Sequence, residues 1–296
     1  MTNQHTATRA VASERVVSTN RGNLFVNDQA GSDPAIVMMH GFPDDHRVYD
    51  RLAPYLQPNR VVTFDWFGYG RSGRREPFSA RPSDHHDELA SVLDELRLAP
   101  VVLVAHDAAG PDAIDFALNN PTRVEHLILL DCYYGNAPAL RLPEMIRLLA
   151  DERLAPLADA MLEDELQRLW LLQHTARRFG ADPTDPTDVG TVSVLPQFFG
   201  DARQSDAMPA IRAWIRDLFA SLDRQDSMIA DGRLAALDTP VTLIFGARDE
   251  FLSPKLADHI AGLFHRAEVH LIDDASHWPQ WDQPETVARL IHATLA

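Results

Sequence analysis

The sequence predicts an α/β fold built around a mostly parallel sheet, and three observations lead to this prediction. Short apolar runs rich in Val, Ile and Leu recur along the 296 residues, as is typical of strands buried on both faces. Amphipathic segments separate these runs, which indicates crossover helices. Polar side chains directly follow several of the runs, where parallel strands end at one edge of a sheet.

The strands and helices are expected in the following order. An opening hairpin is predicted at residues 16–19 and 24–27, with Arg21-Gly22-Asn23 as its turn. Six buried strands follow, at residues 36–39, 61–65, 101–105, 127–130, 241–245 and 269–272. The predicted helices between them are residues 86–96, 111–118, 254–264 and 285–295. This order predicts an eight-stranded sheet with helices on both faces.

The alternation of strand and helix stops between about Gly135 and Leu237. Helical patterns dominate this stretch, at residues 143–150, 163–179 and 209–223, around a Pro/Asp-rich connection, ADPTDPTDVG. The simplest account is a helical insertion within one α/β core. We therefore expect a core of residues 1–135 and 232–296 with an inserted helical cap of residues 136–231.

Composition limits the possible partners and compartments. The formal net charge of −16 argues against nucleic acid and anionic membranes and favours a neutral small-molecule substrate. The single cysteine excludes an internal disulfide, and residues 1–17 lack the apolar segment of a signal peptide. No apolar run approaches the length of a membrane span, and neither a metal-site spacing nor a phosphate-binding glycine loop is present. We expect a cytoplasmic monomer or homodimer without a cofactor.

The segment VVLVAHDAAG, residues 101–110, carries the strongest functional signal. An apolar strand stops at a group of small residues, and a helical pattern begins directly after them. This is the layout of a nucleophile elbow, which usually reads Gly-x-Ser-x-Gly, with Asp107 in place of the serine. The alternative is that Asp107 is a helix N-cap, a position where aspartate is favoured.

With these motifs the chain resembles proteins of the α/β-hydrolase fold family that carry a helical cap. The resemblance covers nearly the whole core. It rests on HGFP at 40–43, DWFGYGRS at 65–72, AHDAAG at 105–110, FGARD at 245–249 and SHWPQ at 276–280. With an aspartate at the elbow, the chain is most similar to haloalkane dehalogenases, epoxide hydrolases and fluoroacetate dehalogenases.

The resemblance implies a hydrolysis in two steps. Asp107 would attack an sp³ carbon and form an alkyl–enzyme ester, and His277 would activate the water that hydrolyses it. A carboxylate would orient the imidazole, and both Asp249 and Asp131 follow strands at suitable positions. Two backbone N–H groups would form the oxyanion hole, those of Phe42 and Ala108.

The residues around the leaving group are less typical. Epoxide hydrolases of this type generally use two cap tyrosines, whereas here Tyr133 and Tyr134 stand only at the entrance to the cap. The cap itself offers indole and imidazole donors, at Trp170, His174 and Trp214, although the two tryptophans also fit a cap core.

Three functions stay open at this point. No arginine lies at residues 108–112, so we do not expect a haloacid substrate. The leading hypothesis is hydrolysis of a neutral alkyl halide, and the alternative is hydrolysis of an epoxide by the same nucleophile. A hypothesis from another class is a ligand-binding protein that has kept the fold without catalysis.

Overall fold

The computed structural model describes residues 12–75, 78, 81–98 and 100–295, and it has the predicted α/β fold. The eight strands form one sheet in the order β1-β2-β4-β3-β5-β6-β7-β8. β2 runs antiparallel to both of its neighbours, and every other pairing is parallel. Residues 1–11, on which most of the signal-peptide expectation depends, lie outside the described part of the chain.

Each expected strand is present. Their bounds are β1 Ala12–Ser18, β2 Asn23–Gln29, β3 Ser32–Met39, β4 Asn59–Phe64, β5 Val101–Asp107, β6 Val124–Cys132, β7 Val241–Gly246 and β8 Ala267–Ile272. Most are longer than the apolar runs that predicted them. The extra residues include polar ones that continue the hydrogen-bonded ladder, as when His126 pairs with Val102. Hydropathy alone does not detect such residues.

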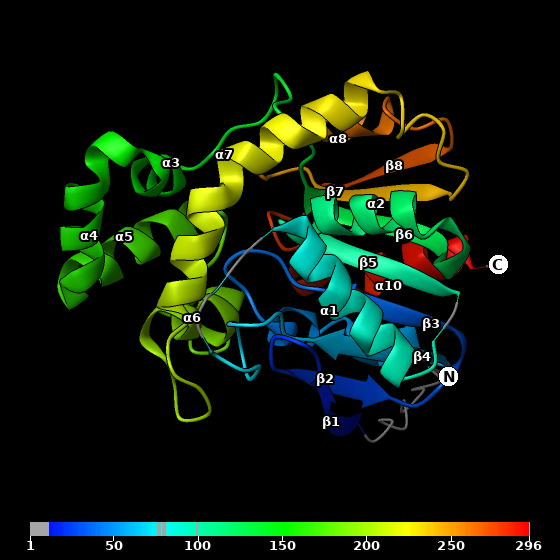
Figure 1. The fold of residues 1–296 in the computed structure, drawn as a ribbon, viewed down its shortest axis with the longest axis horizontal. Helices are drawn as coiled ribbons and strands as arrows, with labels where there is room; N and C mark the ends of the chain where they lie inside the picture. The colour runs from blue at the N-terminus through cyan, green and yellow to red at the C-terminus, as the bar shows by residue number, and fades with distance from the viewer. Residues whose placement is uncertain (1–11, 76–77, 79–80, 99, 296) are drawn as a thin grey trace, which may run out of the picture.

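Helices cover both faces of the sheet (Figure 1). α1, Pro82–Glu95, and α2, Ala109–Asn119, lie in front of the strands in this view. α10, Pro284–Thr294, lies behind them and is preceded by the short helix α9, Pro279–Asp282. α8, Pro254–Ala261, packs against β7 and β8 at the top of this view. The central strands are therefore sealed from water, as parallel strands usually are.

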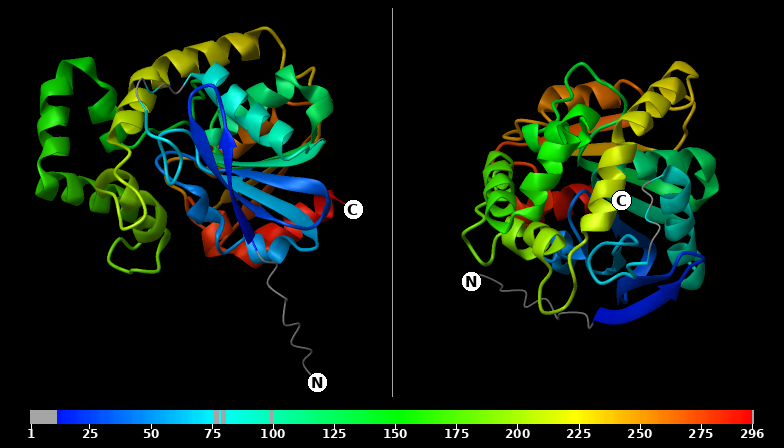
Figure 2. Two further views of the ribbon diagram at one scale, coloured as in Figure 1. Left: turned by 60° about the horizontal axis from the view of Figure 1, so that its bottom comes forward. Right: turned by 60° about the vertical axis from the view of Figure 1, so that its left-hand side comes forward.

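The chain between β6 and β7 is helical and lies to one side of the sheet (Figures 1 and 2). It holds α3 Glu144–Ala150, α4 Ala155–Glu163, α5 Glu165–Arg178, a π-helical turn at Gly190–Val194, α6 Leu195–Phe199 and α7 Met208–Ala230. We use the name cap for residues 136–231, the division proposed from the sequence. α7 crosses from the cap to the edge of the core, at the top of Figure 1.

Two features of the cap differ from the sequence prediction. α7 continues to Ala230 rather than ending at residue 223, because Leu222, Gln225 and Met228 continue one buried stripe. α4 and α6 were not expected, since they are short and their apolar positions form no extended helical period. None of the helices in the described ranges is both long and apolar enough to cross a bilayer.

Candidate active site

The turn between β5 and α2 holds Asp107 in a strained conformation. Its φ is +49°, in the left-handed region that costs a non-glycine residue roughly 1–2 kcal/mol. A Cβ added to Gly41 would lie 2.6 Å from the Asp107 Cβ, and one on Gly110 would lie 2.4 Å from the Cys132 Cβ. The turn therefore needs small residues around it. The N-cap of α2 is Ala108, so the N-cap alternative for Asp107 does not hold.

The Asp107 carboxylate lies between backbone donors. The Phe42 N–H donates to its Oδ2 at 2.9 Å, and the Ala108 N–H donates to the same carboxylate. Burial raises the pKa of Asp107 above its usual value, and nearby His277, His106 and the two N–H groups partly offset this rise. The two backbone groups expected to form an oxyanion hole are thus brought to the elbow.

His277 and Asp249 form a buried pair beside this carboxylate. The His277 Nδ1 lies 2.7 Å from the Asp249 Oδ2. The other Asp249 oxygen accepts hydrogen bonds from the backbone N–H groups of Phe251 and Leu252, at 2.8 and 3.0 Å. A carboxylate partner makes Nδ1 the donor, so Nε2 is the nitrogen left to act as a base.

In this pair, each charged group favours the ionised form of the other. Burial alone would lower the pKa of His277, but the carboxylates of Asp249 and Asp107 raise it above its ordinary value. Burial likewise opposes ionisation of Asp249, yet His277 and the two backbone N–H groups hold the pKa of Asp249 below its usual range.

Asp131, the other candidate for the acid, has different partners. Both of its oxygens accept from the Gly246 N–H, at 3.1 and 3.0 Å, and its φ is +31°. Burial and the neighbouring Asp249 carboxylate raise the pKa of Asp131 well above its usual range. Of the two acids considered from the sequence, Asp249 is the one whose carboxylate accepts the hydrogen bond from the His277 ring.

A second buried His–Asp pair lies behind His277, and sequence reasoning missed it. The His106 Nε2 donates to the His277 carbonyl oxygen at 2.8 Å, and its Nδ1 lies 3.3 Å from the Asp44 Oδ2. The Trp278 Nε1–H donates to the same Asp44 oxygen at 3.3 Å. The sequence feature that could have indicated this pair is the acidic dipeptide Asp44-Asp45, directly after HGFP.

Two cap residues and one core residue lie over this site. The Phe179 ring is 4.3 Å from the His277 ring, and Trp214 stacks on Phe42 at 3.8 Å. Tyr133 is buried, and its pKa is raised well above the usual value by burial and by Asp107. A small cavity of about 20 Å³ is lined by Ala108, Tyr133 and Trp214, among others. Trp214 and Tyr133 are therefore the predicted donors closest to the elbow.

The remaining predicted donors have other surroundings. The Tyr134 hydroxyl donates to the Asp115 Oδ1 at 2.6 Å, so its proton is already engaged within the core. Trp170 and His174 stack on each other, with ring centroids 5.7 Å apart. Both line a cavity within the cap, against Phe251, rather than the small cavity beside Ala108.

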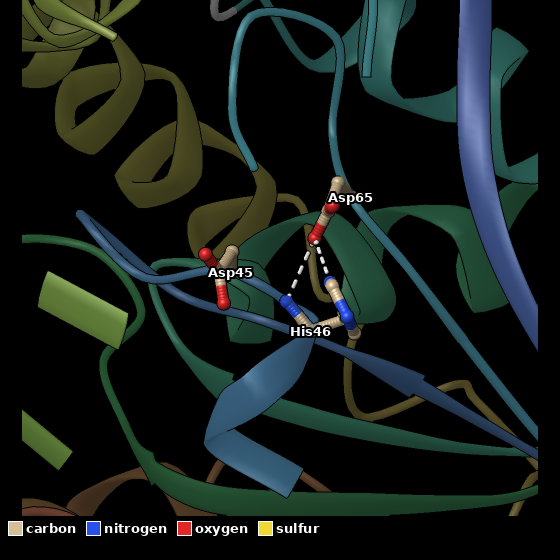
Figure 3. A group of neighbouring side chains, drawn as sticks. All are labelled: Asp45, His46 and Asp65. Carbon is tan, nitrogen blue, oxygen red and sulfur yellow. Dashed lines mark hydrogen bonds and ion pairs between the residues drawn. The ribbon is translucent and has the colours of Figure 1, made fainter. Parts of the chain in front are cut away.

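Asp45, His46 and Asp65 form a compact buried group of the residue types that can bind a metal ion (Figure 3). Asp65 Oδ1 already accepts from the backbone N–H of His46 and faces its Nδ1, at 2.7 and 2.8 Å. The Asp45 carboxylate is held by the guanidinium of Arg47 and the amide of Gln197. A cation would have to displace these donors, so this donor set does not favour a metal.

Comparisons with known proteins identify the family and the fold. A family model described as alpha/beta hydrolase fold matches residues 34–284. A 2-hydroxy-6-oxononadienedioate/2-hydroxy-6-oxononatrienedioate hydrolase of Cupriavidus pinatubonensis is 24% identical, with 90% of this chain and 89% of that protein covered.

Two solved structures show the same fold. Cfl2 from Burkholderia cenocepacia has a TM-score of 0.76 at 22% identity, with 96% of this chain and 95% of that chain covered. The haloalkane dehalogenase DbeA from Bradyrhizobium elkani USDA94 has a TM-score of 0.75 at 18% identity, covering 96% and 98%. At these identities the likeness of the structures concerns the fold alone.

Proposed function

The chain belongs to the alpha/beta hydrolase fold family, and from this premise we propose that it hydrolyses a neutral substrate by attack of Asp107 on an sp³ carbon. One observation carries the proposal. The residue at the elbow is a carboxylate held by two backbone N–H groups, beside a histidine whose Nδ1 is bound to Asp249. A carboxylate is a nucleophile without a base to deprotonate it, whereas a serine hydroxyl at this place would need one.

In the first step one Asp107 oxygen attacks the substrate. The Phe42 N–H holds Oδ2, which leaves Oδ1 as the attacking oxygen. A bond forms between Oδ1 and the carbon while the bond from that carbon to the leaving group breaks, with its electron pair departing as halide or alkoxide. The product is an ester between the substrate carbon and the enzyme.

In the second step His277 removes a proton from a water molecule through Nε2, and the hydroxide attacks the Asp107 carboxyl carbon. The negative oxygen of the tetrahedral intermediate is Oδ2, which the N–H groups of Phe42 and Ala108 stabilise. The intermediate then collapses, and the bond between the carboxyl carbon and Oδ1 breaks. The departing alcohol oxygen takes the proton from His277. Asp249 stabilises the imidazolium in between.

An alkyl halide is the leading substrate class. The chain has 43 acidic and 27 basic residues, so long-range repulsion disfavours anionic substrates. Halide departs without a proton, so the first step needs only donors near the leaving group. The Trp214 indole, stacked on Phe42, and the Tyr133 hydroxyl are the candidates.

An epoxide is the second candidate, and the position of Tyr133 favours it. Ring opening produces an alkoxide that has to be protonated, and a buried tyrosine beside Asp107 keeps its proton because its pKa is raised. The relative from Cupriavidus is named for a dioate substrate. We do not propose such a substrate for this chain, because its net charge of −16 would repel a dicarboxylate. Position 107 also offers no hydroxyl nucleophile.

The test is to trap the ester. His277→Gln and the wild type are incubated with 1-halohexanes and with styrene oxide, and intact masses are measured. We expect an adduct of one alkyl group in His277→Gln, because only hydrolysis of the ester needs the base. Asp107→Asn is the matched control and should show no adduct.

Product analysis separates the two substrates. Halide release without diol supports the dehalogenase, and diol without halide supports the epoxide hydrolase. Full turnover by Asp107→Asn would overturn the covalent mechanism. If no adduct forms with any member of a broad halide and epoxide panel, the non-catalytic ligand-binding alternative gains instead.

A further inference from the structure

The cap contains a cavity of about 300 Å³ that the two catalytic steps do not use. It lies between α3, α4 and α5, and one wall is the core residue Phe251. This volume is at the lower end of cavities that bind small molecules. Apolar side chains line most of it: Met145, Leu148, Met161, Trp170, Leu171 and Phe251. Methionine adapts its shape to different apolar ligands.

The polar groups of the cavity are largely paired with each other. The Arg178 guanidinium donates to Glu144 at 2.6 Å and to the core residue Glu250 at 3.2 Å. The Thr175 hydroxyl donates to the Leu171 carbonyl within α5, at 2.9 Å. The cavity therefore presents no unbalanced charge to a ligand, and an apolar chain fits its lining better than an ionic group.

Two phenylalanine rings connect this cavity with the candidate active site. Phe251 forms the cavity wall, and its ring lies 4.5 Å from the ring of Phe179. Phe179 in turn lies 4.3 Å from the His277 ring. The Phe251 backbone N–H also holds Asp249, so the same residue borders both the cavity and the catalytic acid.

We propose that this cavity binds the unbranched aliphatic chain of a neutral substrate, with the rings of Phe179 and Phe251 separating that chain from His277. The occupant is an alkyl chain because the lining is apolar and its charges are paired. The link to catalysis rests on the proposed function, whereas the binding of an alkyl chain does not depend on it.

Binding is tested directly with 1-alkanols from butanol to decanol, which Asp107 cannot consume, by calorimetric titration of the full chain. Each methylene that enters the cavity should raise the affinity up to roughly fourfold, until the cavity is full. Leu148→Trp and Leu171→Trp place a larger ring at the cavity wall, and each should weaken binding of the longer alkanols about tenfold or more. Leu166→Trp is the matched control, because Leu166 lies on the same helix as Leu171 but is 75% exposed.

The outcomes separate this inference from the proposed function. Chain-length-dependent binding that both cavity variants weaken and Leu166→Trp leaves unchanged supports the inference, whether or not the protein turns over any halide. Affinity that is flat with chain length, or equal weakening by all three variants, overturns it. Leu148 is only half-buried, so its variant keeps the test valid if Leu171→Trp fails to fold.

With an active halide substrate, the same variants give a second readout. kcat/KM for 1-bromoalkanes should rise with chain length in the wild type and level off at a shorter chain in Leu148→Trp. Parallel curves for the two proteins would show that the reacting chain does not enter the cavity.

Discussion

The cap is attached to the core in two different ways. On one side lies a polar latch, made of Asp45 and Arg47 from the core with Ser193 and Gln197 from the cap. On the other side lies an aromatic bridge, made of Phe179 from the cap with Phe251 and His277 from the core. Both attachments adjoin loops of the candidate active site. The polar latch adjoins the loop that follows HGFP, and the aromatic bridge contacts His277.

The polar latch is buried and directional. The Arg47 guanidinium donates to Asp45 at 2.5–3.0 Å, and the Gln197 amide donates to the same carboxylate at 2.8 Å. The Gly70 N–H donates to the amide oxygen of Gln197 at 3.1 Å, and the Asp45 N–H donates to Ser193 at 2.9 Å. The Gly70 N–H, the Asp45 N–H and the Gln197 amide would each lose a partner if the cap moved here.

The aromatic bridge has contacts of another kind. Its rings meet at tilted angles of 43° and 46°, which many neighbouring orientations satisfy about equally well. Its charged neighbour, Arg178, forms half-exposed ion pairs that contribute little energy. One end of the cap is therefore fixed by hydrogen-bond geometry, while the other is held by ring surfaces that can slide over each other. We expect substrate to enter at the second end.

Breaking the latch should have the largest effect. Asp45→Ala leaves the buried Arg47 guanidinium without its main partner, and loss of one member of a buried ion pair costs roughly 3–5 kcal/mol. Urea unfolding should show this decrease in the free energy of unfolding.

The cap supplies a matched control for this variant. Asp151 holds Arg153 through the same spacing, with the same 3.0 Å bonds to its backbone and Nε N–H groups, but at the surface. Asp151→Ala should leave the unfolding curve unchanged. Equal effects of the two variants would contradict the assigned role of the latch.

Gln197→Leu should have the next largest effect. It removes the amide that joins the Gly70 N–H to Asp45 and leaves both groups buried, at a cost of roughly 1–3 kcal/mol. Hydrogen exchange of the Gly70 amide should accelerate along with the fall in stability. An unchanged exchange rate at Gly70 would show that this amide has another partner.

The titration of His277 tests the electrostatics of the bridge. Asp249 and Asp107 raise the pKa of His277 despite its burial, so removal of the Asp107 charge in Asp107→Asn should lower that pKa. NMR titration of the imidazole measures the shift. The base has to be neutral, so ester hydrolysis in the wild type should fall about tenfold per pH unit below this pKa. A pKa that stays the same in Asp107→Asn would contradict the proximity of the two groups.

Phe179→Ala should change stability less than the latch variants do. The ring is half-buried, and its loss should lower the free energy of unfolding by about 1 kcal/mol. If the ring separates the cap cavity from His277, KM for long-chain substrates should change more than KM for short ones. A loss of stability as large as that of Asp45→Ala would show that both attachments are rigid.

Arg178→Gln should have the smallest effect. Its ion pairs to Glu144 and Glu250 are partly exposed, and such pairs contribute under about 1 kcal/mol. Any difference from the wild type in the free energy of unfolding should shrink further at 1 M salt, where charges are screened within a few ångströms. A difference that persists at high salt would indicate that packing of the side chain over Phe251 matters instead.

Much of the core and of the candidate site could be predicted because local signals coincide there. Apolar runs predicted the strands. Small residues surround Asp107 because a Cβ on Gly41 or Gly110 would lie only 2.4–2.6 Å from a neighbouring atom. The pairing of His277 with Asp249 rather than Asp131 was left open. Both acids follow strands, and only the loop after β7 decides which carboxylate meets the imidazole.

The cap was predicted less completely. Its short helices α4 and α6 lack an extended period. The contacts that attach the cap and the base also join remote segments: Gln197 reaches Asp45 across 152 positions, and His106 is hydrogen-bonded to His277 across 171. The Phe179 ring meets Phe251 and His277, 72 and 98 positions further along the chain. No local pattern specifies contacts of that separation.

The sequence by itself determined the α/β class, the order of the strands along the chain and the chemical type of the residue at the elbow, because periodicity and residue identity are local properties. Tertiary structure alone decided which acid contacts His277, which end of the cap is fixed by buried hydrogen bonds, and where the cap leaves a cavity. Those features depend on burial and on distances between remote segments. The pKa of a carboxylate and the stability of a buried hydrogen bond are set by neighbours that only the fold brings together.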